Sequence, residues 1–253
     1  MKTLFPKQED AHRFFTITQH QGHNTLDTSD AGTGKTVVAA ALAKSLGHPV
    51  AVLCPKQVIP SWERELKDMG VDPLFVINYE KIRGGRTKWM TKSGKKIMKW
   101  MLPMGTLLLV DEIHKCKGPY TQNAQIVLSL VNQGYQIHGM SATAAEDPTE
   151  MRSLGYMLKL HSLNKADKPL RSWYSWMTRL GCEKDFWNQW RLTKKSKLKD
   201  LRESMYGIST DRLSVQDLPD AFKENRIFVE PIQFKNLANQ LRMIKMAIFF
   251  LLI

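Results

Sequence analysis

Short apolar runs recur through the first 143 residues, and segments with helical periodicity lie between them. We expect strands at about 24–28 and at PVAVLC (49–54), PLFVIN (73–78), TLLLVDE (106–112) and YQIHGMSAT (135–143). Continuous apolar runs of this length are typical of strands buried on both faces of a sheet. Helices are expected at 7–20, 35–46, 57–69 and 120–132. This alternation predicts the α/β class, with helices on both faces of a parallel β-sheet.

Local signals define the ends of the predicted helices. KTVVAAALAKSL (35–46) is followed by Gly47, a residue that commonly ends helices. The segment at 57–69 becomes regularly helical after Pro60, because proline is tolerated in a first turn. The helix at 7–20 has four candidate apolar positions, Ala11, Phe14, Phe15 and Ile17.

The pattern changes after about residue 150. Residues 150–220 have helical periodicity, several Trp, many Lys and no clear buried strand. We therefore predict an α/β lobe at 1–150, with a basic insertion at 81–100, and a helical extension at 151–224. NRIFVEP (225–231) has the pattern of an extended segment that leaves the domain, so 225–253 is predicted to be a linker or the start of a missing second lobe.

Polar motifs follow three of the predicted strands. SDAGTGKT (29–36) comes after the first, Asp111 and Glu112 end TLLLVDE, and Ser141 and Thr143 end YQIHGMSAT. In parallel α/β sheets ligands bind beyond the carboxyl ends of the strands. The motifs are therefore expected to meet at one edge of the sheet.

SDAGTGKT nearly fits the phosphate-binding pattern G-x-x-x-x-G-K-[ST], with Ser29 in place of the first glycine. Gly32 and Gly34 let the backbone approach closely, and N–H groups at the start of the next helix can face phosphate oxygens. Lys35 would reach the β- and γ-phosphates, and Thr36 would place its hydroxyl on magnesium. The predicted ATP-binding loop is Asp30, Ala31, Gly32, Thr33, Gly34, Lys35 and Thr36. A chance glycine-rich turn is the alternative.

The carboxylate pair of LLLVDEIH decides between these alternatives. A buried strand that delivers Asp111 beside the loop lets this carboxylate hold Mg²⁺ through water. Glu112 is then placed to orient and polarise the attacking water. Lys35, Asp111 and Glu112 are the predicted catalytic residues, and Thr36 and Asp111 the predicted metal residues. Alone, such a pair could also cap a helix.

The charge balance suggests a class of partner. The 253 residues include 37 Lys or Arg against 24 Asp or Glu, a formal net charge of +13. This excess favours nucleic acid, ahead of an anionic membrane, as a polyanionic partner. A basic protein that merely stays soluble is the alternative. The apolar run MAIFFLLI (246–253) is too short to span a bilayer, so no membrane partner is predicted.

Cysteine usage and the N-terminus bear on location. Cys54, Cys116 and Cys182 are widely spaced without a C-x-x-C, which predicts neither a disulfide framework nor a zinc site. MKTLFPKQED has no apolar core of a secretion signal. We therefore expect a cytoplasmic protein, or one in the host cytoplasm or nucleus if viral, that is not secreted.

Two basic segments are candidates for nucleic-acid contact. KIRGGRTKWMTKSGKKIMKW (81–100) carries eight Lys or Arg and no acid, and Ser93–Gly94 could turn a β-hairpin. Its candidate contacts are Arg86, Lys88, Trp89, Lys95 and Lys96. A solvated insertion with Trp89 and Trp100 packed underneath is the alternative. WRLTKKSKLKDLR (190–202) is a second basic run, for which a solvated helix face is favoured.

Taken in order, the motifs resemble those of superfamily two helicases, and within them the SWI/SNF-like DNA translocases. The matching stretches are LFPKQ (4–8), SDAGTGKT (29–36), VLCPKQVIPSWERE (52–65), VINYEKIR (76–83), LLLVDEIHKCKGPYTQNA (107–124) and MSATAAEDPTEM (140–151). RLSVQDLP (212–219) is a weaker match to the segment before the linker between lobes. Ser29–Asp30–Ala31 in the loop and Ile113 in the box depart from the family pattern. The compact basic form suits a phage or viral enzyme.

The resemblance implies a RecA-like first lobe that binds ATP and Mg²⁺, with Gln8 reading adenine. It also implies that Pro55, Lys56, Asn78 and Tyr79 lie along a nucleic-acid track. Three residues would couple the ATP site to that track, namely His114, Ser141 and Thr143.

The resemblance also requires a second RecA-like lobe with arginine fingers, and no candidate motif follows residue 220. Without such an arginine, turnover is expected to fall about 10³-fold or more. The chain is therefore interpreted as a truncated or split translocase, or as one half of a two-piece enzyme whose other polypeptide supplies the missing lobe.

The leading hypothesis is the ATP-binding lobe of a DNA-dependent ATPase, a helicase or translocase. An RNA helicase is the first alternative, because the chemistry is the same on another polymer. A non-hydrolysing module that binds ATP and nucleic acid is the second, because the second lobe is absent. A small-molecule kinase is disfavoured, since it gives no reason for the DEIH and SAT segments.

Overall fold

A six-stranded parallel sheet forms the centre of the protein in the computed structural model, which describes residues 3–93, 97–143, 147–163 and 171–218. The strand order is β10-β1-β7-β6-β2-β3, and every neighbouring pair is parallel. The strands are β1 (Thr25–Asp27), β2 (Val50–Cys54), β3 (Phe75–Asn78), β6 (Leu107–Asp111), β7 (Gln136–Met140) and β10 (Thr210–Asp211). The described residues belong to one unit, Met1–Ala221.

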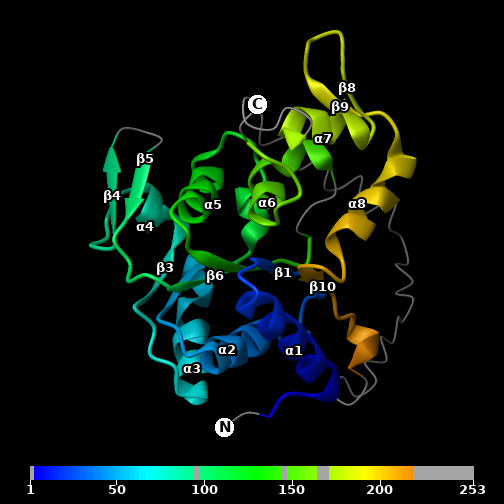
Figure 1. The fold of residues 1–253 in the computed structure, drawn as a ribbon. Helices are drawn as coiled ribbons and strands as arrows, with labels where there is room; N and C mark the ends of the chain where they lie inside the picture. Colours follow the sequence, from blue (N-terminus) through cyan, green and yellow to red (C-terminus); the bar gives the residue numbers. More distant parts are fainter. Residues whose placement is uncertain (1–2, 94–96, 144–146, 164–170, 219–253) are drawn as a thin grey trace, which may run out of the picture. The chain divides into compact units, whose positions relative to one another are not determined.

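Helices cover both faces of this sheet (Figure 1). One face carries α1 (Pro6–His20), α2 (Lys35–Leu46) and α3 (Ile59–Met69), and the other carries α5 (Gln122–Asn132) and α6 (Arg152–Met157). The shorter helices are α4 (Tyr79–Arg83), α7 (Trp173–Arg179) and α8 (Leu198–Met205). The described residues also include five 3₁₀ turns, namely Lys56–Val58, Ile113–Cys116, Pro148–Glu150, Lys195–Lys197 and Val215–Asp217.

Alternation along the central strands builds two apolar cores. In β6, Leu107 and Leu109 pack against α1, α2 and α3, whereas Leu108 and Val110 pack with residues of α5 and α6. All four side chains are fully buried. A continuous apolar run is therefore required in a strand that is covered on both faces. The predicted α/β class with a parallel sheet is confirmed.

The predicted elements before residue 143 are present within one to three residues of their expected ends. α2 ends at the predicted Gly47, which adopts a left-handed φ of 63° that glycine tolerates. Two details are wrong. β3 is an edge strand in which only alternate side chains are buried. Ile17, expected on the apolar face of the first helix, is 53% exposed.

Residues 150–220, where no clear buried strand was expected, nevertheless contribute a strand to the central sheet. β10 joins the central sheet with Thr210 beside Leu26 and Asp211 beside Asp27. β8 (Cys182–Lys184) and β9 (Trp190–Leu192) form an antiparallel hairpin. A two-residue Thr-Asp strand carries no apolar run, so its burial depends on the neighbouring sheet. The division of the chain at about residue 150 stays a prediction. The predictions for 225–231 and 246–253 concern segments outside the described residues.

The basic insertion forms the predicted hairpin, from β4 (Met90–Ser93) and β5 (Ile97–Trp100), although its turn lies outside the described residues. Trp100 is only 4% exposed, and its indole N–H donates to Ser129 Oγ at 2.8 Å. Trp89 is half-buried against Phe75, with ring centroids 6.1 Å apart. Both Trp side chains thus pack toward the protein, as the alternative interpretation requires.

In the part of the chain that the structure describes, no helix is long and apolar enough to cross a membrane.

His138 is a buried titratable group between the sheet and α1. Its ring is fully buried, lies 4.7 Å from the ring of Phe15, and places Nδ1 2.9 Å from Thr25 Oγ1. Burial lowers the pKa of His138 to about 3. An unfolded chain binds a proton at this residue below about pH 6.5, whereas the folded chain does not.

We therefore predict that acid destabilises the fold partly through His138. The contribution of neutral His138 to the unfolding free energy is fully present above about pH 6.5 and is lost as the pH falls toward 3. When the pH is lowered from 7 to 5, the unfolding free energy of the wild type should fall by about 2 kcal/mol more than that of the variant His138→Gln. Urea unfolding at both pH values measures this, with His20→Gln at an exposed site as control. Equal pH dependence in wild type and His138→Gln would contradict the prediction.

Candidate nucleotide site and nucleic-acid surface

The three polar motifs begin side by side at one edge of the sheet. β7 lies between β1 and β6, and its last residue, Met140, is in register with both Asp27 and Asp111. The loop 29–36 follows β1, the DEIH segment follows β6, and Ser141 follows β7. The expected convergence at the carboxyl ends of the strands is therefore observed.

The glycine loop is shaped by two left-handed residues. Gly32 and Gly34 have φ values of 84° and 85°, and α2 begins directly after them. A Cβ on Gly34 would lie 2.5 Å from Nε2 of Gln8 and would displace that side chain, and the φ of Gly34 is strained for any other residue. Nε2 of Gln8 donates to Thr33 O at 2.8 Å, and its Oε1 accepts from Phe5 N at 3.0 Å. Gln8 thus lies against the loop as the motif predicts, and its role in reading adenine stays a prediction.

The Lys35 side chain spans the loop. Its Nζ donates to the carbonyl oxygens of Ser29 and Asp30, at 2.7 and 2.8 Å. Ala31 and Gly32 are exposed, Thr33 is buried, and Gly34, Lys35 and Thr36 are half-buried. The N–H groups of Lys35 and Thr36 precede the first backbone bonds of α2, which run from Val37 and Val38 to Gly34 O. The loop therefore offers an ammonium group and helix N–H donors to an anion on the outer side of the sheet edge.

Ser29 has a structural role that the sequence analysis missed. Its hydroxyl oxygen accepts from Leu213 N at 2.9 Å, and the N–H of Asp30 donates to Leu213 O at 2.8 Å. Arg212 also pairs with Asp30, at 2.9 Å. These contacts bind the loop to the segment after β10, which contains RLSVQ of the weakest motif match. A glycine at position 29 could not accept the bond from Leu213.

Asp111 is held by donors from three elements. Its Oδ1 accepts from Glu112 N and its Oδ2 from the indole of Trp62, both at 2.9 Å. The hydroxyl of Tyr79 donates to Asp111 O at 2.6 Å. Burial raises the pKa of Asp111, and the indole bond and the charge of Lys35 partly offset this effect. Trp62 belongs to the matched W-E-R-E stretch, but no role was predicted for it.

Glu112 and the proposed coupling residues form a connected group. Glu112 has a left-handed φ of 51°, which is uncommon for a residue other than glycine and is typical of functional sites. Nδ1 of His114 lies 3.0 Å from Glu112 Oε2 and 2.9 Å from Ser141 Oγ. The N–H of Thr143 donates to Ser141 Oγ at 3.3 Å. An Nδ1–H on His114 can therefore donate to either the carboxylate or the hydroxyl.

Thr36 and Asp111 offer a donor set that fits Mg²⁺. Thr36 supplies a hydroxyl from the first turn of α2, and Asp111 supplies a carboxylate from the end of β6. The described ranges contain no group of three or more His, Cys, Asp and Glu that could hold a metal. Mg²⁺ is commonly bound by one or two protein oxygens together with phosphate and water. The arrangement suits a metal that arrives with a nucleotide better than a metal held by protein alone.

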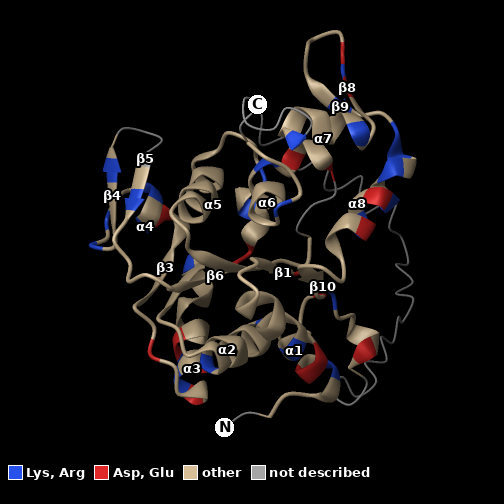
Figure 2. Cartoon of the chain, viewed as in Figure 1, with Lys and Arg blue, Asp and Glu red and all other residues tan. Residues whose placement is uncertain are grey.

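Several of the predicted nucleic-acid residues surround one depression beyond β2 and β3. It has a volume of about 330 Å³ and is lined by Lys56, Ile59, Asn78, Glu80, Lys81 and Arg86. Glu80 is paired with Arg83 at 2.9 Å, so the lining carries a net positive charge. Figure 2 shows Lys and Arg along α4 and β4 beside it. Asn78 also caps α4 by accepting from Lys81 N at 3.0 Å.

Other members of the predicted track lie elsewhere. Tyr79 is only 1% exposed, so its expected place on the surface is wrong; its hydroxyl instead supports the end of β6. Pro55 is also buried, where β2 ends, and presents no surface to a ligand. Lys88 is exposed, with Nζ 4.9 Å from the centroid of the Trp89 ring. Lys95 and Lys96 lie outside the described residues.

We predict that Ser29→Ala loosens the segment after β10. The substitution leaves the N–H of Leu213 without its acceptor, which costs about 1–3 kcal/mol for a buried donor. Amide hydrogen exchange at Leu213 should therefore become faster, and urea unfolding should occur at lower urea concentration. Ser214→Ala is the matched control, because that hydroxyl bonds Asp217 in an exposed turn. Unchanged exchange at Leu213 would show that the Ser29 bond does not hold the segment.

Comparisons with known proteins agree with this geometry. No protein-family model matches the chain. A protein of Acanthamoeba polyphaga mimivirus named "Putative ATP-dependent RNA helicase" is 32% identical over 154 residues, which cover 53% of this chain and 29% of the viral protein. The chain thus matches less than a third of that relative.

Two solved structures from Sulfolobus solfataricus share the fold. One is a SWI2/SNF2 ATPase core in complex with dsDNA, with a TM-score of 0.56 and 18% identity over 87% of this chain and 47% of that chain. The other is the core domain, with a TM-score of 0.57 and 18% identity over 84% of this chain and 44% of that chain. The chain spans about half the length of these structures. The resemblance is therefore confirmed at the level of the fold: this chain has the fold found in SWI2/SNF2 ATPase cores.

Proposed function

We propose that this chain is the ATP-binding lobe of a DNA-dependent ATPase that moves along or remodels DNA. The observation that carries the proposal is the shared strand edge, where the glycine loop, the carboxylate pair and Ser141 begin in one register. A chance glycine-rich turn would have no reason to lie beside the other two motifs. The mimivirus relative and the SWI2/SNF2 cores support a nucleic-acid-dependent ATPase.

The residues at this edge suit phosphoryl transfer to water. Lys35 and the N–H groups of the loop bind the β- and γ-phosphates, and Gln8 contacts the base. Thr36 and Asp111 hold Mg²⁺, which, when bound, neutralises charge on the phosphates. Glu112 orients the attacking water and accepts its proton. Asp111 is fixed for this task by Trp62 and by the backbone N–H of Glu112.

His114 links this chemistry to the rest of the sheet edge. Its Nδ1 can donate to Glu112 Oε2 or to Ser141 Oγ, both within about 3.0 Å. A change in the contacts of Glu112 therefore changes the contacts of Ser141 and, through it, of Thr143. Nucleic acid is proposed to bind along Lys56, Asn78 and Arg86, with Lys88, Trp89, Lys95 and Lys96 of the insertion as further candidate contacts.

The polymer and a second lobe belong to the proposal as well. The dsDNA in one Sulfolobus complex favours DNA, whereas the name of the mimivirus relative favours RNA, which stays the second candidate. An arginine finger is proposed to come from a second lobe or a second polypeptide, because phosphoryl transfer in this class is accelerated by such a group. The protein is proposed to act in the cytoplasm, or in the host cytoplasm or nucleus.

We predict that Glu112→Gln lowers ATP turnover about 10²-fold or more and leaves ATP binding intact. Lys35→Ala should instead weaken ATP binding, because it removes the ammonium group of the loop. Turnover and nucleotide affinity would be measured without polymer and with single-stranded DNA, duplex DNA and RNA. Glu203→Gln, an exposed carboxylate on α8, is the matched control.

The outcomes separate the candidate functions. Turnover that one polymer stimulates and Glu112→Gln abolishes supports an ATPase and names its polymer. ATP and nucleic-acid binding without turnover would favour the non-hydrolysing module. Turnover that persists in Glu112→Gln would contradict the role of this carboxylate.

We also predict that Lys81→Ala combined with Arg86→Ala weakens duplex DNA binding in a salt-dependent manner. Each lost phosphate contact should reduce the slope of log affinity against log salt by about 0.9, so the slope should fall by about 2. Fluorescence anisotropy at several salt concentrations measures this. Lys67→Ala is the control, because it removes a positive charge from the last turn of α3, outside the lining of the depression. An unchanged slope would place the duplex elsewhere.

A further inference from the structure

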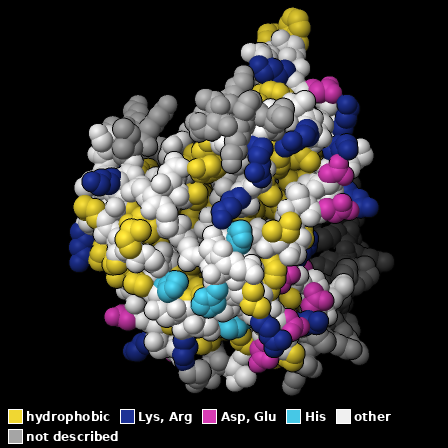
Figure 3. All heavy atoms as spheres, in the orientation of Figure 1, with side chains coloured by type: hydrophobic (Ala, Val, Ile, Leu, Met, Phe, Trp, Pro, Cys, Tyr) yellow, Lys and Arg dark blue, Asp and Glu magenta, His cyan; other side chains and the backbone are white. Residues whose placement is uncertain are grey.

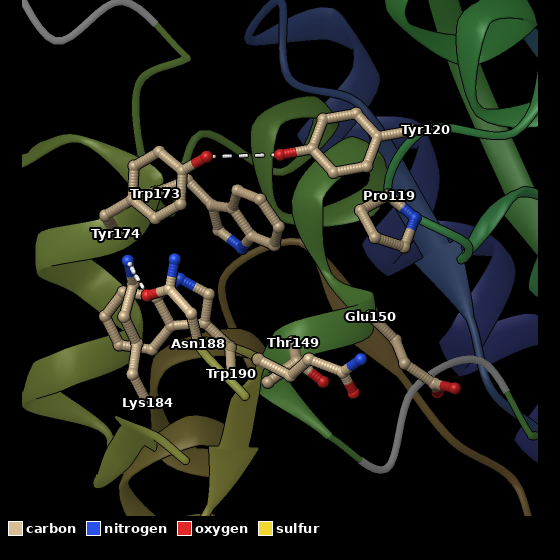
Figure 4. A pocket seen from close by; sticks show the side chains of 10 residues that line it. Pro119, Tyr120, Thr149, Glu150, Trp173, Tyr174, Lys184, Asn188 and Trp190 are labelled. Atoms are coloured by element: carbon tan, nitrogen blue, oxygen red, sulfur yellow. Dashed lines mark hydrogen bonds between the residues drawn. The ribbon is translucent and has the colours of Figure 1, made fainter. Parts of the chain in front are cut away.

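A wide aromatic pocket lies beyond the loops that follow the DEIH and SAT segments (Figure 4). It has a volume of about 920 Å³. Its lining comes from the loop before α5, the 3₁₀ turn at Pro148–Glu150, α7 and the β8–β9 hairpin. The ion pair of Lys117 with Glu150, at 2.9 Å, joins two of these segments. None of the residues predicted to bind ATP or nucleic acid lines this pocket.

Four aromatic rings form the wall of the pocket. Tyr174 lies between Trp173 and Trp190, with centroids 5.3 and 5.8 Å away and planes inclined by 39° and 31°. The ring of Tyr120 is 6.4 Å from that of Trp173, and its hydroxyl is 3.1 Å from the hydroxyl of Tyr174. Tyr120 and Tyr174 are 67% and 43% exposed, so ring faces and edges remain open to a ligand.

Polar groups accompany the rings. Lys184 Nζ donates to Asn188 Oδ1 at 2.7 Å and lies 5.7 Å from the centroid of the Trp190 ring. Thr149 and Gln189 also line the pocket. Amide, hydroxyl and ammonium groups beside aromatic faces suit a flat, polar-edged ring better than an aliphatic chain. A nucleobase has this chemistry, because it stacks through its faces and forms hydrogen bonds through its edge.

The hairpin next to the pocket presents two further rings to solvent. Phe186 and Trp187 are 93% and 75% exposed at the turn between β8 and β9. The turn is held by Asp185, whose Oδ1 accepts from the N–H groups of Trp187 and Gln189 at 2.9 Å, while its Oδ2 pairs with Arg191 at 2.6 Å. Two large apolar side chains on a fixed turn are a candidate contact surface.

The charge around these rings favours nucleic acid over a protein partner. Residues 182–202 contain seven Lys or Arg and three Asp or Glu. Figure 3 shows dark blue side chains below the apolar tip of the hairpin and along the neighbouring surface. Protein interfaces are depleted in lysine, whereas single-strand sites combine cationic grooves with aromatic platforms.

We propose that the pocket and the hairpin tip bind unpaired nucleotides of a nucleic-acid strand. The aromatic rings stack on the bases, and the surrounding Lys and Arg neutralise the phosphates. The proposal rests on the proposed function and adds a second contact to the depression beyond β2 and β3. Most of the aromatic rings of this second contact lie on α7 and on the β8–β9 hairpin, and this hairpin was not expected from the sequence.

The experiment compares two aromatic variants with the wild-type chain. One combines Tyr120→Ala with Tyr174→Ala, and the other combines Phe186→Ser with Trp187→Ser. Binding to a labelled oligo(dT) strand and to a blunt duplex of equal length is measured by fluorescence anisotropy. Met104→Ser, which removes a side chain that is 78% exposed elsewhere, is the control. Equal thermal unfolding of all variants verifies their fold.

Each aromatic variant should bind the single strand about tenfold more weakly, the loss expected for stacking on one base. Affinity for the blunt duplex should change less than twofold, and ATP binding should be unchanged. The tryptophan fluorescence of the wild type should be quenched by oligo(dT), and less so in the variant that lacks Trp187.

The outcomes distinguish this proposal from the proposed function. Wild-type strand affinity in both aromatic variants, with the wild type binding normally, would overturn the pocket proposal alone. Failure of the wild type to bind any nucleic acid would overturn both. Unchanged strand binding, together with loss of a self-association detected by sedimentation, would identify the aromatic surface as a protein interface and overturn the pocket proposal.

Discussion

The shared register of β1, β7 and β6 fixes the geometry on which the candidate site depends. Asp27, Met140 and Asp111 lie side by side, and neighbouring strands are about 4.8 Å apart. The three motifs that follow are therefore near neighbours. The register cannot slip by one residue, because that would exchange Leu108 and Leu109 between two differently packed cores. Apolar packing inside the sheet thus positions the polar chemistry at its edge.

The glycine loop is held by more than its own backbone. Ser29 and Asp30 bind the backbone of Leu213, and Asp30 pairs with Arg212. The segment after β10 and the loop therefore form one hydrogen-bonded unit, and neither can move far without breaking bonds to the other. The substitution of serine for the first glycine of the pattern has a direct physical reason in this contact.

Two hairpins that each carry two Trp residues have opposite surroundings. Trp100 of β5 is buried and bonded to Ser129 of α5, whereas Trp187 between β8 and β9 stands in solvent. The presence of Trp in a hairpin therefore does not tell which of these rings is buried. The difference arises because β5 lies against α5, while the tip between β8 and β9 extends beyond the helices that support it.

The sequence by itself determined the α/β class, most of the strands and helices before residue 143, and the positions of the glycine loop and of the carboxylate pair at strand ends, although it did not indicate α4. These features depend on local signals, namely apolar runs, glycines that end helices, and motifs whose residues lie close together in the sequence. It could not place Tyr79, which was expected along a nucleic-acid track but is buried, with its hydroxyl bonded to Asp111 O. It also missed β10, because a two-residue strand has no pattern of its own.

Only the tertiary structure decided which distant residues meet. Trp62 reaches Asp111, Arg212 reaches Asp30, and His114 reaches Ser141. Such contacts join parts of the chain separated by tens of residues or more, and no local preference encodes them. They follow from strand order and helix packing, which bring together side chains that periodicity and motif spacing treat as independent.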